Sequence, residues 1–234
     1  MNFEVCATNI QSALAAQRAG AHRIELCSAL DVGGLTPSMG LVRAARASGI
    51  PVHVLIRPRE GDFCYTEAEL AIMLDDIRLC RLAGAAGVVV GALTPEGLLD
   101  MPKMRAMRAA VKGFEMTCHR AFDFTPDPEE ALEQLIEMGF DRVLSSGQSN
   151  SAFEGRFALK KLVEQARGRI TVMPGAGIHA QNIRAIAEFT GAKDFHFTGK
   201  RKVFASGVRN IPGLEAWHWE SEVEAIREII KAVV

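Results

Sequence analysis

The chain has 234 residues, of which 48% are apolar and 24% are charged, as in ordinary globular proteins. Its 27 lysines and arginines nearly balance 28 aspartates and glutamates, giving a formal net charge of −1. This composition excludes a disordered or fibrous chain and makes nucleic acid and anionic membranes poor candidates as partners. No apolar run approaches the roughly 18 residues of a membrane helix, and the first residues lack a signal-peptide core, so we expect a cytoplasmic protein.

Short β-rich apolar segments alternate with helical segments along the chain, a pattern typical of βα units that build a parallel sheet. Helices are predicted at residues 9–19, 66–83 and 127–138, each followed by a glycine suited to a left-handed helix end. The predicted strands are residues 3–6, 23–27, 52–57, 87–91, 114–119, 142–146, 170–173 and 194–197.

Eight βα repeats without a linker rich in proline, glycine or serine favour an α/β fold with one closed barrel. We therefore expect a single (β/α)8 TIM-type barrel over residues 1–234. An open doubly wound sheet is the alternative. It is disfavoured because no glycine fingerprint follows the first strand, where Thr8, Asn9 and Ile10 stand.

Alternate residues of a barrel strand face the lumen and the surrounding helices. One parity of the predicted strands is apolar and is assigned to the helices: Val5, Ile24, Leu26, Val52, Val54, Ile56, Val143, Val172, Phe195 and Phe197. The other parity is polar and is assigned to the lumen: Glu4, Cys6, Arg23, Glu25, Cys27, His53, Arg57, Glu115, Thr117, His119, Ser146 and His196. The deep members Glu4, Arg23 and Glu115 are expected to satisfy one another's charges, whereas those at strand ends lie at the C-terminal mouth, where barrel enzymes do their chemistry.

A cluster of ionisable residues, His119, Arg120 and Asp123, follows the fifth predicted strand. A histidine transfers protons near neutrality, an arginine binds an oxyanion through two hydrogen bonds, and an aspartate orients either group. We take Glu25, His119 and Asp123 as candidate catalytic residues. The alternative for the cluster is a buried ion-pair network that closes the loop.

Candidate anion ligands follow several strands. Of Arg57 and Arg59, one is expected to reach the lumen and the other to pair with Asp62 or a neighbouring loop. The glycine-containing turns 174–177 and 198–202 stand where barrel enzymes often hold a phosphate, although tight loop geometry also explains their glycines. The candidate substrate-binding residues are Arg57, Arg120, Ser146, Gly175 and Gly177.

The five cysteines show no spacing typical of zinc sites or secreted disulfide frameworks, so free thiols in a reducing compartment are expected. Cys6 and Cys27 share the lumen parity and end two strands that lie about 4.8 Å apart in a parallel sheet. Two thiolates at this separation suit a soft monovalent ion such as Cu(I). The alternative is that both thiols fill a narrow layer of the core. Cys64, Cys80 and Cys118 are interpreted as packing or incidental.

Six segments carry a resemblance to a known family: residues 4–6, 20–27, 33–38, 56–63, 119–123 and 173–177. In this order they resemble the CutC copper homeostasis family. The resemblance implies a cytoplasmic βα barrel that assembles as a homo-oligomer and is associated with copper handling, with Cys6 and Cys27 as Cu(I) ligands. It does not extend over residues 198–219, whose role stays open.

Two functions of different classes follow. In the first, the protein binds Cu(I), its one expected cofactor, through the cysteine pair at the barrel mouth and buffers or delivers copper in the cytoplasm. In the second, it is an enzyme acting on a small anionic substrate, such as a phosphorylated one. His119 or Glu25 then serves as acid or base, and Arg57, Arg120 and the glycine turns hold the anion.

Overall fold

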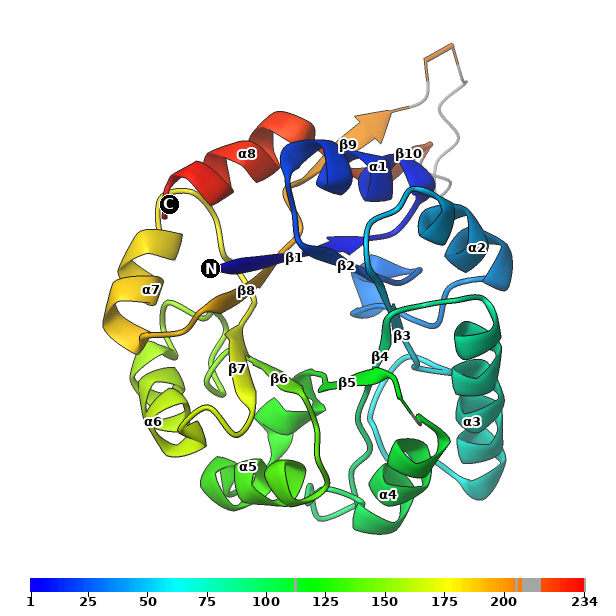
Figure 1. Ribbon diagram of the computed structural model, residues 1–234, viewed down its shortest axis with the longest axis vertical. Coiled ribbons are helices and arrows are strands. Elements are labelled where there is room, and N and C mark those ends of the chain that lie inside the picture. The colour runs from blue at the N-terminus through cyan, green and yellow to red at the C-terminus, as the bar shows by residue number, and fades with distance from the viewer. Residues whose placement is uncertain (112, 205, 208–215, 234) are drawn as a thin grey trace.

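The computed structural model describes residues 1–111, 113–204, 206–207 and 216–233. Eight parallel strands surround the lumen: β1 (Asn2–Ala7), β2 (Arg23–Leu26), β3 (Val52–Leu55), β4 (Gly87–Val90), β5 (Glu115–Cys118), β6 (Arg142–Ser145), β7 (Thr171–Pro174) and β8 (Asp194–Phe197). They pair in the order β7-β6-β5-β4-β3-β2-β1-β8 and form a nearly closed barrel (Figure 1). Because the strands follow chain order and β8 returns to pair with β1, the predicted TIM-type barrel is confirmed and the open doubly wound sheet is wrong.

Helices form a ring outside the strands (Figure 1). They are α1 (Ile10–Ala19), α2 (Met39–Ala47), α3 (Glu67–Leu82), α4 (Met101–Ala110), α5 (Pro128–Glu137), α6 (Arg156–Ala166), α7 (Ile183–Thr190) and α8 (Val223–Lys231). Within the described part of the chain, none of them combines the length and the apolar character that crossing a membrane requires.

The three helices predicted from the sequence are confirmed, and their starts are set by side-chain caps. Asn9 accepts a hydrogen bond from the backbone amide of Ser12 at 2.8 Å and so starts α1. Thr66 and Glu69 form a reciprocal capping box at the start of α3. The predicted ranges differ from the observed helices because they included these cap residues.

The strand parity predicted from the sequence is also confirmed. Val5, Ile24 and Val54 have no exposed surface and belong to the apolar layer between the strands and the helices. The opposite parity faces the lumen, where Cys6 and Cys27 pack with Leu55 and Val89 in a separate small cluster. The apolar layer holds the barrel together, which leaves the lumen free to carry charged and polar groups.

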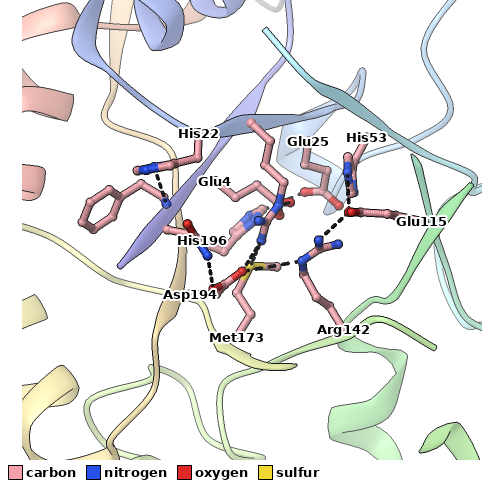
Figure 2. Close-up of polar contacts among 12 residues, drawn as sticks. Glu4, His22, Glu25, His53, Glu115, Arg142, Met173, Asp194 and His196 are labelled. Carbon is pink, nitrogen blue, oxygen red and sulfur yellow. Dashed lines mark hydrogen bonds and ion pairs between the residues drawn. The ribbon is translucent and has the colours of Figure 1, made fainter. Parts of the chain in front are cut away.

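Ion pairs cross the deep part of the lumen (Figure 2). Arg23 contacts Glu4 at 2.6 Å and Asp194 at 2.9 Å. Arg142 lies 3.6 Å from Asp194 and also pairs with Glu115. The expected pairing is therefore confirmed for Glu4 and Arg23, whereas Glu115 is 49% exposed and pairs with Arg142 and His53 rather than with these two residues.

Two of these partners, Arg142 and Asp194, were not predicted from the sequence. Both begin a strand, where the side chain points inward with the same parity as the lumen residues further along. Glu115 also lies 3.3 Å from His53, and the hydrogen bond from His53, together with the charge of Arg142, lowers the pKa of Glu115 to about 2.

An antiparallel hairpin of β9 (Lys200–Phe204) and β10 (Trp217–Ser221) occupies the segment whose role the sequence left open. Asn9 donates a hydrogen bond to the backbone oxygen of Trp219 at 2.8 Å, and the Trp219 indole nitrogen donates to Asp31 at 2.7 Å. Residues 205 and 208–215 of the open segment lie outside the described residues. The described part of the hairpin therefore packs against the loops after β1 and β2.

Candidate metal centre

A cavity of about 490 Å³ lies at the C-terminal mouth of the barrel. This volume is within the range of about 300 to 1,000 Å³ that is usual for small-molecule sites. Of the site residues predicted from the sequence, those that line it are Cys6, Glu25, Cys27, Arg57, His119, Arg120 and Gly177. Asp123, Ser146 and Gly175 are not part of its lining.

The two cysteines end neighbouring strands and meet in the lumen. Cys6 lies beside Glu25 in the register of β1 and β2, and the amide of Cys27 continues this ladder by donating to Ala7. The Cys6 and Cys27 sulfurs are 3.6 Å apart, and both residues are buried as free thiols. The hydrogen bond with Cys27, together with burial, raises the pKa of Cys6 well above its ordinary value.

A second group of donors adjoins the same thiol. The ligand atoms of Cys6, Glu25 and His196 all lie within 4.8 Å of one another. His196 Nε2 is 3.5 Å from Glu25 Oε2, and His196 Nδ1 donates to Glu4 Oε1 at 2.8 Å. Figure 2 shows His196 among these carboxylates, next to the deep ion pairs. Strand parity placed His196 in the lumen at the mouth of the barrel, but the sequence assigned it no catalytic, anion-binding or metal-binding role.

The charges in this group stabilise one another. Burial alone would lower the pKa of His196, but the charge of Glu25 and hydrogen bonds with Cys6 and Glu4 raise it well above the ordinary value. Burial raises the pKa of Glu25. Burial would also raise the pKa of Glu4, yet the hydrogen bond from His196 and the charge of Arg23 lower it strongly. An ionised Glu4 therefore accompanies a cationic His196.

On the opposite side of the mouth, Asp123 is surrounded by donors. It belongs to the short 3-10 helix η2 (Arg120–Phe124), and its carboxylate accepts hydrogen bonds from the Ser145 hydroxyl at 2.6 Å and the Ser146 amide at 3.0 Å. The Gln148 backbone amide and Arg120 Nε also donate hydrogen bonds to this carboxylate, at 3.3 Å and 2.8 Å. This arrangement ties the loop after β5 to the loop after β6.

Arg120 and Ser146 belong to the same network. Arg120 Nη2 donates to the Ser146 hydroxyl at 2.8 Å, and this hydroxyl also lies 3.0 Å from Asp123. The Arg120 side chain is 43% exposed and lines the cavity. Arg120 can therefore contact a ligand while it remains bound to Asp123.

His119 is buried beside this network and is neutral near pH 7. Burial, reinforced by the charge of Arg57, lowers its pKa to about 3. Its Nδ1 accepts a hydrogen bond from the backbone amide of Ala121 at 3.1 Å. The single ring proton of the neutral imidazole therefore lies on Nε2. His119 is therefore a hydrogen-bond donor at neutral pH, packed 4.9 Å from the Phe63 ring centroid.

Arg57 holds two loops together at the rim of the cavity. Its Nη1 donates to the carbonyls of Val32 at 2.7 Å and Gly34 at 2.9 Å, and its Nη2 donates to Gly61 at 2.8 Å. The expected pairing of Arg59 with Asp62 is confirmed at 2.9 Å. Most of the donors of Arg57 therefore serve the loops after β2 and β3.

The two candidate glycines after β7 differ in their surroundings. The Gly175 amide donates a hydrogen bond to the backbone oxygen of Ser145 at 2.9 Å, and a Cβ at this position would lie 2.4 Å from Leu144 Cδ1 and would displace that side chain. Gly177 has a φ of 67° and lines the cavity. Close packing therefore disfavours a side chain at Gly175, whereas Gly177 combines a positive φ that favours glycine with a place in the lining of the candidate ligand space.

The fold and site together define a TIM-type barrel with a reduced cysteine pair at its mouth. Residues 1–201 match the model of the CutC family. The chain is 46% identical to a CutC family protein of Parabacteroides distasonis, over 99% of this chain and 98% of the relative. It is 50% identical to a protein of Homo sapiens named copper homeostasis protein cutC homolog, over 85% of this chain and 73% of the relative. The chain therefore belongs to the CutC family, as its sequence motifs predicted.

Solved structures agree with this assignment. A crystal structure of a copper homeostasis protein CutC from Streptococcus agalactiae has a TM-score of 0.81 and 37% identity, covering 85% of this chain and 98% of that one. A thiamine phosphate pyrophosphorylase from Pyrococcus furiosus has a TM-score of 0.60 at 18% identity, covering 99% and 94% of the two chains. The second likeness concerns the barrel fold alone.

Proposed function

We propose that this protein binds Cu(I) through Cys6 and Cys27 and buffers or delivers copper in the cytoplasm. The observation that carries the proposal is the 3.6 Å separation of the two sulfurs at the wall of the cavity. Thiolates are soft ligands, and Cu(I) accepts the low coordination number that two of them offer. Relatives named copper homeostasis proteins support the same role.

A competition titration with a Cu(I) chelator tests this proposal on the reduced protein. Cys6→Ser, Cys27→Ser and the double variant should lose binding alike, because one sulfur cannot replace a two-sulfur site. Cys64→Ser is the matched control and should keep the wild-type affinity, since Cys64 lies in a loop and contacts Thr94. Wild-type affinity in the double variant would refute the proposal.

A second candidate function, an enzyme acting on a small anion, is favoured by the size and charge of the cavity. About 490 Å³ is far more space than a single ion needs, and Arg57, Arg120 and Lys200 contribute to its walls. Glu25 would be the base, because burial raises its pKa above the ordinary value of a glutamate. His119 would donate a hydrogen bond, and Asp123 would hold Arg120 in position.

Calorimetric titration with inorganic phosphate and with small phosphorylated metabolites tests the enzyme hypothesis. Binding should weaken in Arg120→Gln and in Lys200→Gln, whereas Arg201→Gln, an exposed position on the same hairpin, is the control. If none of these anions binds to the wild-type protein, the enzyme hypothesis loses its main support.

We also propose that the protein assembles as a homo-oligomer. Phe157 on α6 is 61% exposed and Phe153 before it is 40% exposed, so large apolar side chains gather at this part of the surface. Such patches often mark contacts between chains. Light scattering coupled to size-exclusion chromatography should give a mass of more than one chain, and Phe157→Asp should lower it. A monomeric wild-type protein would contradict this proposal.

A further inference from the structure

The hydrogen bonds of His196 resemble those of a metal-binding histidine. Metal-binding histidines usually donate their second ring nitrogen to a carboxylate, which fixes the ring and raises its basicity. His196 Nδ1 donates to Glu4 at 2.8 Å, and Arg23 in turn holds Glu4 at 2.6 Å. This leaves His196 Nε2 as the ligand atom, directed toward Glu25 and Cys6.

The distances within the group already approach those of a coordination sphere. Around a tetrahedral ion with metal–ligand bonds of about 2.0 to 2.3 Å, neighbouring ligand atoms lie roughly 3.3 to 3.8 Å apart. His196 Nε2 and Glu25 Oε2 are 3.5 Å apart, and Cys6 completes a set within 4.8 Å. A contraction of about 1 Å or less would therefore enclose an ion.

The donor set selects the kind of ion. One thiolate, one carboxylate and one neutral imidazole carry a total charge of −2, which a divalent cation neutralises. Burying the resulting neutral centre costs less free energy than burying a charged one. Sulfur, nitrogen and oxygen donors together suit Zn²⁺ or a similar ion rather than Mg²⁺ or Ca²⁺. Three protein ligands leave a fourth position, and all three residues line the cavity from which a water or small anion can fill it.

We propose that Cys6, Glu25 and His196 form a site for a divalent ion of the Zn²⁺ class, distinct from the Cu(I) pair but sharing its Cys6 thiolate. Cys27 lies outside this group, although its sulfur is 3.6 Å from that of Cys6. Because one thiolate cannot serve both arrangements fully, the two metals exclude each other. The divalent site stands without the proposed copper function, since it does not need Cys27.

Titration of the reduced protein with Co²⁺, a visible stand-in for Zn²⁺, tests the proposal. Wild type and Cys27→Ser should both show the near-ultraviolet absorption of a cobalt–thiolate bond, and Zn²⁺ should remove it. Cys6→Ser should lack the band. His196→Gln and Glu25→Gln should bind Co²⁺ at least about 10- to 100-fold more weakly, a loss usual even for partners that only orient a ligand. His218→Gln, at an exposed histidine, is the matched control.

Two further measurements separate loss of a ligand from loss of the fold. Thermal unfolding and circular dichroism of His196→Gln and Glu25→Gln should match a folded barrel, and chelator-buffered Cu(I) should remove the cobalt–thiolate band from the wild-type protein. Absence of the band in the wild type, its survival in Cys6→Ser, or its loss in Cys27→Ser would each overturn the divalent site. Failure of the copper proposal has a different signature, namely Cu(I) affinity that does not depend on Cys27.

Discussion

The two sides of the barrel mouth use similar residues in different ways. On the side of β1, β2 and β8, the ligand atoms of Cys6, Glu25 and His196 converge on one point next to the cavity. On the side of β5 and β6, Asp123 accepts hydrogen bonds from the loop after β6, and Arg120 bonds to both Asp123 and Ser146. Polar residues at strand ends therefore converge on a candidate metal site on one side and fix the loops on the other.

The buried histidines of the two sides illustrate the difference. Two carboxylates flank His196 and raise its pKa well above the usual value, whereas burial and the charge of Arg57 lower the pKa of His119 to about 3. The same side chain is thus a cation on one side and a neutral donor on the other. Its neighbours, rather than its position at a strand end, decide its chemistry.

The largest effect is expected from removing the centre of the loop-fixing side. Asp123→Ala should lower the free energy of unfolding by about 3 to 5 kcal/mol, because it leaves several buried donors without an acceptor. Cys27→Ser, on the side of the candidate metal site, should lower the free energy of unfolding by about 1 kcal/mol or less, since its main packing contacts persist. Urea denaturation of both variants checks this, and equal losses would contradict the contrast between the two sides.

A smaller effect is expected from acid. The folded-state pKa of His119 is about 3, against about 6.5 in an unfolded chain, so the unfolded state binds more protons between these values. The stability that neutral His119 contributes is present above pH 6.5 and is lost as the pH falls toward 3, by about 3 kcal/mol between pH 6.5 and 4. In denaturant unfolding over this pH range, the free energy of unfolding of His119→Gln should depend less on pH than that of the wild-type protein. Parallel curves for the two proteins would rule the effect out.

The smallest effect is expected from Arg120→Ala. The side chain is 43% exposed, and solvent screens its ion pair with Asp123. We expect a loss of about 1 kcal/mol or less by thermal or urea unfolding, because the serine and backbone donors still hold Asp123. A loss as large as that of Asp123→Ala would show that the arginine, rather than the carboxylate, organises the loops.

The barrel and the cysteine pair could be predicted because both depend on local regularities. The period-two pattern of the strands assigned Val54 and its equivalents to the helices and Cys6 and Cys27 to the lumen, and the structure confirms both assignments. Neighbouring strands in chain order also pair in space, which brings the ends of the first two strands together. None of this requires knowledge of the opposite wall of the barrel.

The contacts of His196 could not be predicted in the same way. Glu4 and Glu25 are 192 and 171 positions earlier in the chain, and which lumen side chains share a level depends on the stagger of the closed barrel. For the same reason no zinc-like spacing appears in the sequence, since the three donors come from three separate strands. The ion pair of Asp123 with Arg120 fits the network that the sequence offered as an alternative for this cluster. Its bonds to the Ser145 hydroxyl and to the backbone amides of the loop after β6 were not predicted, because contacts between separate loops leave no pattern in the sequence.

The deep ion pairs have a mechanical consequence for the barrel. β7 and β8 are the two ends of the hydrogen-bonded strand order. Arg23 lies 3.0 Å from Met173 on β7 and 2.9 Å from Asp194 on β8, and Asp194 also contacts Arg142 on β6 at 3.6 Å. Side-chain contacts therefore stabilise the joint between β7 and β8, where the barrel closes. The described strands pair β8 with β1 but not with β7, so this joint depends on side chains, and loss of the Asp194 carboxylate should loosen it before any paired strands separate.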